Sequence, residues 1–382
     1  MTAAAARACP VCGGSPGALF DNRMAPLGAL DMSYTVCECT GCGFIYAGHL
    51  PAAAQYGDYY ARFSKYDTGA GVSAVDEARG RAALQVLEAR LPQSATVVDI
   101  GCGSGALLSL LRQAGFHDLH GVDPAPNAAQ RAREAFGLEG VRRGTMADCH
   151  AHVPLATADA VLVMAVLEHL WDPARDIAGL LGHLRPGCRV VVEVPALETF
   201  DAARGEPYGE LSLEHIQFFS LASLDAFMAS LGAHRLEHVF AALPGIHAQS
   251  LIAMYEAHGQ AERPVGSRRD AELMRDYLRV SEARLQAAMA KVPPGPGIVY
   301  GAGSHTARLL PALARRGGFE TRLLVDANPN LQGTTMGGHA IEPAQAIARH
   351  PDLPVIVSSY RFQAPIAQRL SQDFPNPVVT LY

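Results

Sequence analysis

The sequence lacks a long apolar segment and has no excess of basic residues, and each absence excludes a class of protein. The longest obvious apolar run, Val161–Leu167, falls far short of the roughly 18 residues that suggest a membrane span. Lysine and arginine number 31 against 37 aspartate and glutamate, and the formal charge of −6 gives no overall basic field for nucleic acid or anionic lipid. The N-terminal segment reaches Cys9 before the apolar core of a signal peptide could form. We therefore expect a cytoplasmic protein that acts on a small molecule, with neither nucleic acid nor a membrane as partner.

The chain is too long for a single core of the usual size, and its 382 residues predict two or three domains. Residues 1–60 are rich in cysteine and glycine, residues 61–255 alternate between strand and helix patterns, and residues 256–382 begin with a charged helix and then alternate again. In the middle region we expect the strands Thr96–Ile100, Leu119–Val122, Ala160–Ala165 and Arg189–Val194. The predicted fold class is α/β, with a Rossmann-like domain between an N-terminal metal-binding module and a C-terminal Rossmann-like domain.

The cysteines are grouped near the N-terminus rather than spread like a disulfide framework. Two CxxC pairs predict a zinc site made by Cys9, Cys12, Cys39 and Cys42. Four thiolates leave no open position for a substrate, and the predicted zinc is therefore structural. Cys37 stands two residues before Cys39 and could compete as a ligand, and free thiols without metal are the alternative to a zinc site.

A glycine-rich turn, GCGSG at residues 101–105, follows the apolar strand that contains Asp99. A strand that runs into such a turn and then into a helix brings backbone close to a ligand at the carboxyl end of the sheet. The next strand ends in Asp123, whose carboxylate can accept hydrogen bonds from both hydroxyls of a ribose. Enzymes that use NAD carry glycine turns at the same place, and the turn alone leaves that alternative open.

Several motifs together resemble class I S-adenosylmethionine-dependent methyltransferases. They are Asp99 with the turn Gly101–Gly105, Asp123, the segment Val166–Leu170, the turn Leu184–Cys188 and the segment Gly144–Asp148. The resemblance implies S-adenosyl-L-methionine as cofactor. It also implies the binding residues Asp99, Gly101, Cys102, Gly103, Gly105, Asp123, Thr145 and Met146. Thr145 stands where the family usually has an acidic residue, so we expect only backbone or apolar contacts from Thr145 and Met146.

The segment Leu213–Ser220 narrows the resemblance, together with the cysteine pairs and a second glycine turn at Tyr300–Ser304. The whole chain resembles the three-domain, zinc-containing sugar C-methyltransferases of deoxysugar biosynthesis. This resemblance implies His215 as general base, Glu214 as its support, Tyr66 as a further catalytic residue, and a C-terminal domain that holds the carrier end of the substrate. The chain departs from the family pattern at Ser212, where the family has a tyrosine, and Tyr208 is the nearest alternative.

Some of these residues have simpler interpretations. Glu214 and His215 could cap a helix over residues 216–219, and the pair Glu168–His169 is predicted to shape the pocket rather than to react. The C-terminal turn with Asp326 imitates a dinucleotide-binding motif, although nothing else in the chain supports a redox role. His305, just after that turn, could assist in holding phosphate there, although we expect it to face solvent.

The sequence thus predicts an S-adenosylmethionine-dependent methyltransferase. The expected acceptor is a nucleotide-linked sugar or a related biosynthetic intermediate, methylated at carbon with the help of a base. The alternatives are an O-methyltransferase of a glycan or natural-product intermediate, and a non-catalytic scaffold that binds zinc and cofactor. The sequence defines neither the acceptor nor the oligomeric state, and it is compatible with a monomer.

Overall fold

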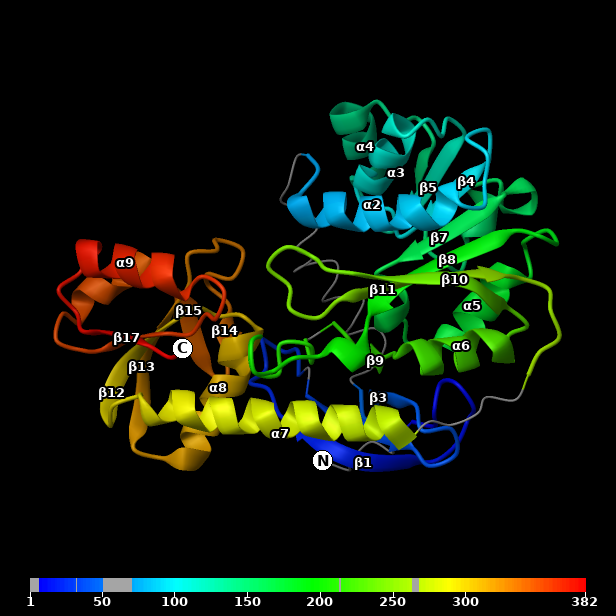
Figure 1. Cartoon of the computed structure of the whole chain (residues 1–382). Helices are drawn as coiled ribbons and strands as arrows, with labels where there is room; N and C mark the ends of the chain where they lie inside the picture. The colour runs from blue at the N-terminus through cyan, green and yellow to red at the C-terminus, as the bar shows by residue number, and fades with distance from the viewer. Residues whose placement is uncertain (1–6, 32, 51–70, 213, 263–267) are drawn as a thin grey trace.

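The computed structural model describes residues 7–31, 33–50, 71–212, 214–262 and 268–382, and three β-sheets run through them (Figure 1). The N-terminal sheet is antiparallel and has the order β1-β2-β3-β9. Its strands are β1 (Pro16–Asn22), β2 (Tyr34–Cys39), β3 (Ile45–Ala47) and β9 (Gln217–Phe218). Because β9 comes from far along the chain, the segment that ends with His215 is held against the N-terminal module.

The central sheet has the order β10-β11-β8-β7-β4-β5-β6 among the described strands. Its strands are β4 (Val97–Ile100), β5 (Leu119–Asp123), β6 (Val141–Arg143), β7 (Ala160–Met164), β8 (Arg189–Pro195), β10 (His234–Ala241) and β11 (Ser250–Glu256). The strands from β6 to β8 are parallel and follow the Rossmann order 3-2-1-4-5, whereas β11 is antiparallel to β8. In such a sheet, ligands bind at the carboxyl ends of the strands where the order reverses, which here is the end of β4.

Helices cover the central sheet (Figure 1). They are α2 (Ala74–Glu88), α3 (Ala106–Gln113), α4 (Ala128–Phe136), α5 (Pro173–Leu181) and α6 (Leu221–Ser230), with the 3-10 turns η2 (Cys149–Ala151), η3 (Leu155–Thr157), η4 (Leu167–His169) and η5 (Leu197–Thr199). Strands β4 and β7 are buried along their whole length, as parallel strands covered on both faces must be. Local signals set the helix starts: Ser73 and Asp76 form a capping box on α2, and Asp172 caps α5.

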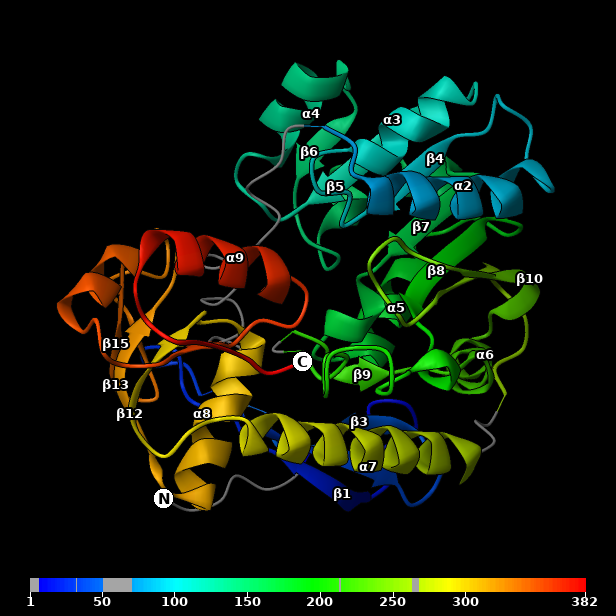
Figure 2. The same ribbon diagram turned by 60° about the vertical axis from the view of Figure 1, so that its left-hand side comes forward.

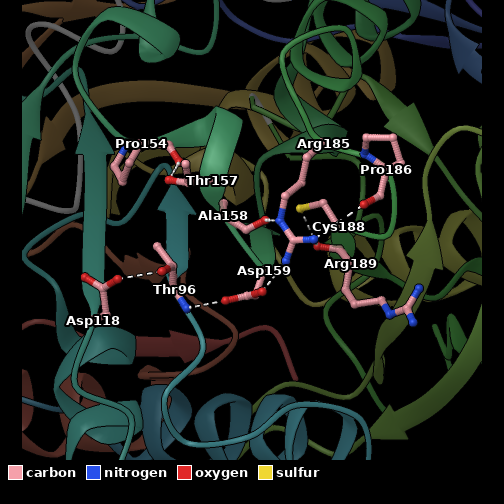
Figure 3. A network of polar contacts seen from close by, with 10 residues as sticks. All are labelled: Thr96, Asp118, Pro154, Thr157, Ala158, Asp159, Arg185, Pro186, Cys188 and Arg189. Atoms are coloured by element: carbon pink, nitrogen blue, oxygen red, sulfur yellow. Dashed lines mark hydrogen bonds and ion pairs between the residues drawn. The ribbon is translucent and has the colours of Figure 1, made fainter.

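A polar network ties together the amino end of this sheet (Figure 3). The Asp159 carboxylate accepts the Thr96 amide at 2.8 Å and pairs with the Arg185 guanidinium. The hydroxyl of Thr96 donates to Asp118 at 2.5 Å. These bonds join the residues just before β4, β5, β7 and β8, and they leave the carboxyl ends of the strands to the site.

The C-terminal sheet has the order β14-β15-β13-β12-β16-β17, and β15 to β17 are parallel. Its strands are β12 (Gly295–Tyr300), β13 (Phe319–Val325), β14 (Thr335–Met336), β15 (His339–Glu342), β16 (Val355–Val357) and β17 (Val378–Thr380). Its helices are α8 (Ser304–Arg316), η6 (Ala344–Arg349) and α9 (Gln363–Asp373). The parallel order again reverses at β12, so the predicted α/β class with two Rossmann-like units is confirmed.

The long helix α7 (Arg268–Ala290) connects the three parts of the molecule. Figures 1 and 2 show it running from α8 of the C-terminal domain to the N-terminal sheet. Its buried residues share one hydrophobic cluster with residues of β2, of the segment before β9 and of the C-terminal sheet. Arg275 on α7 also pairs with Glu38 of β2 at 2.7 Å. Among the described residues, none of the helices is long and apolar enough to span a membrane.

Candidate active site

The predicted glycine turn lies at the carboxyl end of β4, and three of its residues need conformations that favour glycine. Gly101, Gly103 and Gly105 have φ angles of 81°, 54° and 84°. A Cβ on Gly101 would lie 2.5 Å from Cγ2 of Val166, because the loop after β7 packs directly on the turn. A Cβ on Gly103 would meet nothing within 4 Å. The turn therefore combines tight packing beneath Gly101 with open space above Gly103.

Asp123, at the end of β5, is fixed beside this turn. Its Oδ2 accepts the Gly103 amide at 2.8 Å, and its Oδ1 accepts the Ala125 amide at 2.8 Å. An ionised carboxylate has about four acceptor positions, so such a group can accept hydroxyls as well as amides. The structure thus presents an oriented carboxylate next to the open space at Gly103, which suits a ribose.

Asp99 on β4 is a buried carboxyl group, 2% exposed. Its Oδ1 has no hydrogen-bond partner among the described residues. Burial, and after it the charge of Asp123, raises the pKa of Asp99 to about 7. A buried acceptor without a partner is costly, and a cationic ligand at the end of β4 would supply one.

A second buried carboxylate lies near Asp99 and is neutralised. Arg79 of α2 places its Nε 2.5 Å from Oε2 of Glu193 on β8, and the Ser250 hydroxyl donates to Oε1 of Glu193 at 2.6 Å. Arg79 also lowers the pKa of Asp99 by its charge, against the stronger effect of burial. Neither Arg79 nor Glu193 stood out in the sequence, because the partners come from α2, β8 and β11 and carry no local motif.

Thr145 and Met146 follow β6. The Thr145 amide and hydroxyl both donate to Oδ1 of Asp148, at 2.6 and 2.8 Å, and these bonds lower the pKa of Asp148. Met146 is half-buried against the hydrophobic cluster that includes Val122. The acidic side chain of this segment thus stands at Asp148 and organises the turn itself, which leaves Met146 as the apolar surface.

The four predicted zinc ligands meet at one point in the structure. The Sγ atoms of Cys9 and Cys42 are 3.7 Å apart, those of Cys12 and Cys39 are 3.4 Å apart, and all four lie within 4.8 Å of one another. Thiolates around one Zn²⁺ at about 2.3 Å have sulfurs about 3.8 Å apart in a tetrahedron, so the group fits this metal. Cys37 is buried with its sulfur against Gly48 and is not part of the group.

The two Glu-His pairs of the sequence lie in one place. His169 of η4 has its Nδ1 3.0 Å from the carbonyl oxygen of Glu214, and the rings of His169 and His215 meet edge to face with centroids 5.0 Å apart. Glu168 is 2% exposed, its pKa is raised by burial, and its backbone carbonyl accepts the Ile216 amide at 2.9 Å. Val166, two residues before Glu168, is the side chain that packs on Gly101, and the pairs therefore adjoin the glycine turn.

The structure contradicts the helix-capping expectation for Glu214 and His215, and it does not describe Tyr66. The capping role of Glu214 and His215 on a helix over residues 216–219 is wrong, because the chain there forms β9 and pairs with β3. Ser212 instead bends the chain: its Oγ accepts the amides of Glu214 and His215 at 3.3 and 3.1 Å. Tyr66 lies outside the described residues.

Tyr208, the alternative tyrosine, is buried against α7. Its hydroxyl donates to Glu282 at 2.6 Å and its amide donates to the Ser281 hydroxyl at 3.0 Å. Burial, followed by the hydrogen bond to Glu282, raises the pKa of this phenol. Tyr208 thus joins the segment before His215 to the connecting helix.

The C-terminal glycine turn repeats part of this arrangement. Oδ2 of Asp326 accepts the Ala302 amide at 2.7 Å, and Oδ1 accepts the Asn328 amide at 2.7 Å. The expectation that His305 faces solvent is wrong: it is 6% exposed and bonds to Ser358 and Tyr382 at 2.9 and 2.8 Å. Burial, followed by the charge of Arg308, lowers the pKa of His305 to about 4.

Several known proteins have sequences similar to this chain. Residues 75–238 match a family model described as a methyltransferase domain. The chain is 27% identical over 348 residues to C-methyltransferase NovU of Streptomyces niveus. This alignment covers 85% of this chain and 79% of NovU. The chain is 37% identical over 120 residues to trans-aconitate 2-methyltransferase of an Azoarcus species, and this alignment covers 31% of this chain and 46% of that relative.

The chain thus spans about half the length of the trans-aconitate 2-methyltransferase, and 51% of a probable S-adenosylmethionine-dependent methyltransferase of Mycolicibacterium smegmatis. Among solved structures, 1,6-didemethyltoxoflavin-N1-methyltransferase of Burkholderia thailandensis is 17% identical, with a TM-score of 0.41, and covers 61% of this chain and 99% of that one. The family model spans the glycine turn, Asp123 and the Glu168–His169 pair, and this region of the chain is therefore similar to a methyltransferase domain.

Proposed function

We propose that this protein transfers a methyl group from S-adenosyl-L-methionine to a small-molecule acceptor. The observation that carries the proposal is the pair of carboxylates at the glycine turn: Asp123 is oriented beside the open space at Gly103, and Asp99 is buried with an oxygen that lacks a partner among the described residues. An adenosine attached to a positively charged amino-acid chain matches both groups, whereas the pyrophosphate that NAD places at such a turn is negatively charged and would be repelled by Asp99.

The residues of the turn have separate tasks in this proposal. Asp123 accepts the two ribose hydroxyls, and Gly103 leaves room for the backbone to approach the ligand. Asp99 faces the cationic methionine half, and Met146 provides an apolar contact for the adenine. Cys102, which is buried between Gly101 and Gly103, shapes the turn through its backbone. When bound, the donor supplies an electrophilic methyl group on a sulfonium.

His215 is the proposed general base, with His169 against its ring and Glu214 next to it. A neutral imidazole can accept a proton near neutral pH, and here it adjoins the glycine turn through Val166. Removal of a proton from a carbon beside a carbonyl, or from a hydroxyl, leaves a nucleophile in reach of the methyl group. The remaining requirement is to align the nucleophile with the methyl group, and a site of fixed geometry provides this alignment.

For the acceptor we propose a nucleotide-linked sugar that carries a carbonyl, methylated at carbon. The similarity to NovU supports this choice because it extends over 85% of the chain and is to a C-methyltransferase. The C-terminal turn with Asp326 offers a second oriented carboxylate, suited to the ribose of such a carrier.

We also propose that Cys9, Cys12, Cys39 and Cys42 hold a structural zinc ion. The bound metal would stabilise the sheet on which β9 pairs, and through β9 the position of His215. Metal analysis should find zinc in the purified protein, and Cys39→Ser should remove it and lower the thermal stability. A zinc content that does not change in this variant would contradict the assignment.

Isotope exchange tests the chemistry. The protein, without methyl donor, is incubated in deuterated water with a nucleotide-linked keto-sugar, and deuterium next to the carbonyl is followed by mass spectrometry. Carbon methylation predicts exchange that falls about 100-fold in His215→Gln, as expected for loss of a general base. Donor affinity should be native in that variant, and the exposed His183→Gln serves as control. Methyl transfer without any exchange would favour an oxygen acceptor, and donor binding without transfer to any acceptor would favour a scaffold.

A further inference from the structure

Glu168, His169 and His215 form a cluster of ligand-type side chains at the end of β7. One oxygen or nitrogen of each lies within 4.8 Å of the others. The cluster is built from two segments that backbone and side-chain hydrogen bonds hold together. The Ile216 amide donates to the Glu168 carbonyl at 2.9 Å, and Nε2 of Gln217 donates to the Leu170 carbonyl at 2.9 Å. The arrangement is therefore fixed by the fold.

The hydrogen bond of His169 determines which of its nitrogens can act. Nδ1 is 3.0 Å from the carbonyl oxygen of Glu214, and a carbonyl can only accept, so Nδ1 carries the hydrogen. In the neutral ring, Nε2 then presents a lone pair, and it lies 3.7 Å from Oε1 of Glu168. Either a proton on Nε2, which makes an ion pair with Glu168, or a metal ion can hold these two atoms together.

Glu168 gives an independent indication. The residue is 2% exposed, and its Oε2 has no hydrogen-bond partner among the described residues. Native structures rarely leave a buried carboxylate oxygen without a partner, and a bound ion can satisfy such an oxygen.

We propose that Glu168, His169 and His215 bind one divalent transition-metal ion, separate from the four-thiolate site. One carboxylate and two imidazoles suit ions such as Zn²⁺, Co²⁺, Mn²⁺ or Fe²⁺. The bond from His169 Nδ1 to a backbone carbonyl is the outer contact that metal-ligating histidines commonly make. Three protein ligands leave further coordination positions open, whereas the four thiolates close theirs.

A metal at this place would give these residues a role beyond the proposed function. A hydroxyl or carbonyl oxygen of an acceptor is the group that would fill an open position, where a cation makes it more acidic. In the metal-loaded protein His215 would be a ligand, and acidification of the acceptor by the metal would replace the proton transfer to His215 that is proposed above for the metal-free protein. Methyl donor binding at the glycine turn does not depend on either state.

Cobalt titration tests the proposal. The intact purified protein is titrated with Co²⁺ and followed by absorbance and calorimetry, because cobalt on thiolates absorbs strongly in the near ultraviolet and cobalt on nitrogen and oxygen ligands does not. We expect one binding event without the thiolate signal. Glu168→Gln and His169→Gln should each weaken it at least about tenfold, as loss of a ligand does at metal sites. His150→Gln, in the exposed pair of stacked histidines formed with His183, should leave it unchanged.

The outcomes are separable. Absence of this binding event, or an event that only His150→Gln removes, would overturn the proposal and show adventitious binding only. Should the variants fail to fold, anomalous scattering from cobalt-soaked crystals of the unchanged protein decides: a peak between Glu168 and the two imidazoles supports the site, and cobalt at the thiolates alone contradicts it. In a separate titration, the protein is titrated with methyl donor in the presence of a chelator. Protein that binds donor there, but binds no cobalt in the cobalt titration, contradicts the metal site and leaves the proposed function standing.

Discussion

The molecule contains two glycine turns built on the same backbone plan, at the ends of β4 and β12. In each, a strand leads into a turn and a helix, and an aspartate at the end of the neighbouring strand accepts an amide of the turn. Gly103 donates to Asp123 at 2.8 Å, and Ala302 donates to Asp326 at 2.7 Å. The geometry that orients a carboxylate toward a ribose is thus present twice.

The turns differ in charge. Two residues before the first glycine, β4 carries Asp99 where β12 carries Val299, and both are buried. Of the two turns, the first therefore has a buried anion on its strand with an oxygen to offer to a cationic ligand. We therefore propose that both turns suit a nucleoside, and that the buried carboxyl group of Asp99 makes the first turn the one that takes a sulfonium donor.

The largest expected effect separates the two carboxylates. Asp123→Asn should weaken binding of S-adenosylmethionine about 100-fold, because two hydrogen bonds to a charged acceptor are lost or weakened. Asp326→Asn should leave it unchanged. Calorimetric titration of both variants measures the difference, and equal losses in the two would contradict the assignment of the donor to the first turn.

Asp99→Asn addresses the charge. In the free protein the pKa of Asp99 is raised to about 7, and a bound cation favours the ionised form. Donor affinity should therefore fall about tenfold from about pH 8 to about pH 6, as a proton must leave before the donor binds. The variant should lose both this pH dependence and affinity. A native pH profile in the variant would show that another group titrates.

The same group affects stability in the opposite direction. Because folding raises the pKa of Asp99, the folded state holds the proton more firmly, and this contribution to stability decreases as pH rises from about 4 to about 7. At about pH 8, Asp99→Asn should increase the free energy of unfolding by at most about 4 kcal/mol, since each pKa unit corresponds to about 1.4 kcal/mol. Urea unfolding at two pH values measures it.

A smaller effect distinguishes the two backbones. Gly103 has a φ angle of 54°, whereas Gly303 caps α8 with a φ angle of −92°. Gly103→Ala should cost about 1–2 kcal/mol of stability through backbone strain, and its methyl group would project into the donor space. Gly303→Ala should be close to neutral. Thermal unfolding and donor titration measure the two variants. A Gly103→Ala variant with native donor affinity would argue against a ligand at this turn.

Substitutions at the amino ends of the strands, opposite the site, should affect stability only. Asp159→Ala removes the bonds to the Thr96 amide and to Arg185, which lie at the amino ends of the strands (Figure 3). We expect a loss of about 1–3 kcal/mol in unfolding free energy, as for charge-assisted hydrogen bonds, with native donor affinity. A clear loss of donor affinity would mean that the amino and carboxyl ends of the strands are coupled.

The parts of the site that are local in the chain could be predicted from the sequence. The glycine turn, Asp123 and the CxxC pairs each consist of residues whose spacing alone implies a geometry. The same holds for the strands and helices around them, because alternation of buried strands with helices is a short-range pattern.

The contacts that complete the site come from distant segments and could not be predicted in this way. His169 meets His215 only because residues 216–218 hydrogen-bond to η4 and pair with β3, an association that no short motif encodes. His305 is buried because Ser358 and Tyr382 arrive from the end of the chain. Asp99 could be selected by motif, but its raised pKa, and the lack of a partner for its Oδ1 among the described residues, depend on burial and on the neighbouring Asp123.

The central claim is that the turn of Gly101–Gly105, with Asp123 and Asp99, binds the methyl donor. Crystals of the protein grown with S-adenosylhomocysteine test it most directly. The account predicts density for the adenosine at this turn, with both ribose hydroxyls in hydrogen-bond contact with the Asp123 carboxylate. Density at the turn of Gly301–Gly303 instead, or an empty first turn at saturating ligand, would contradict it.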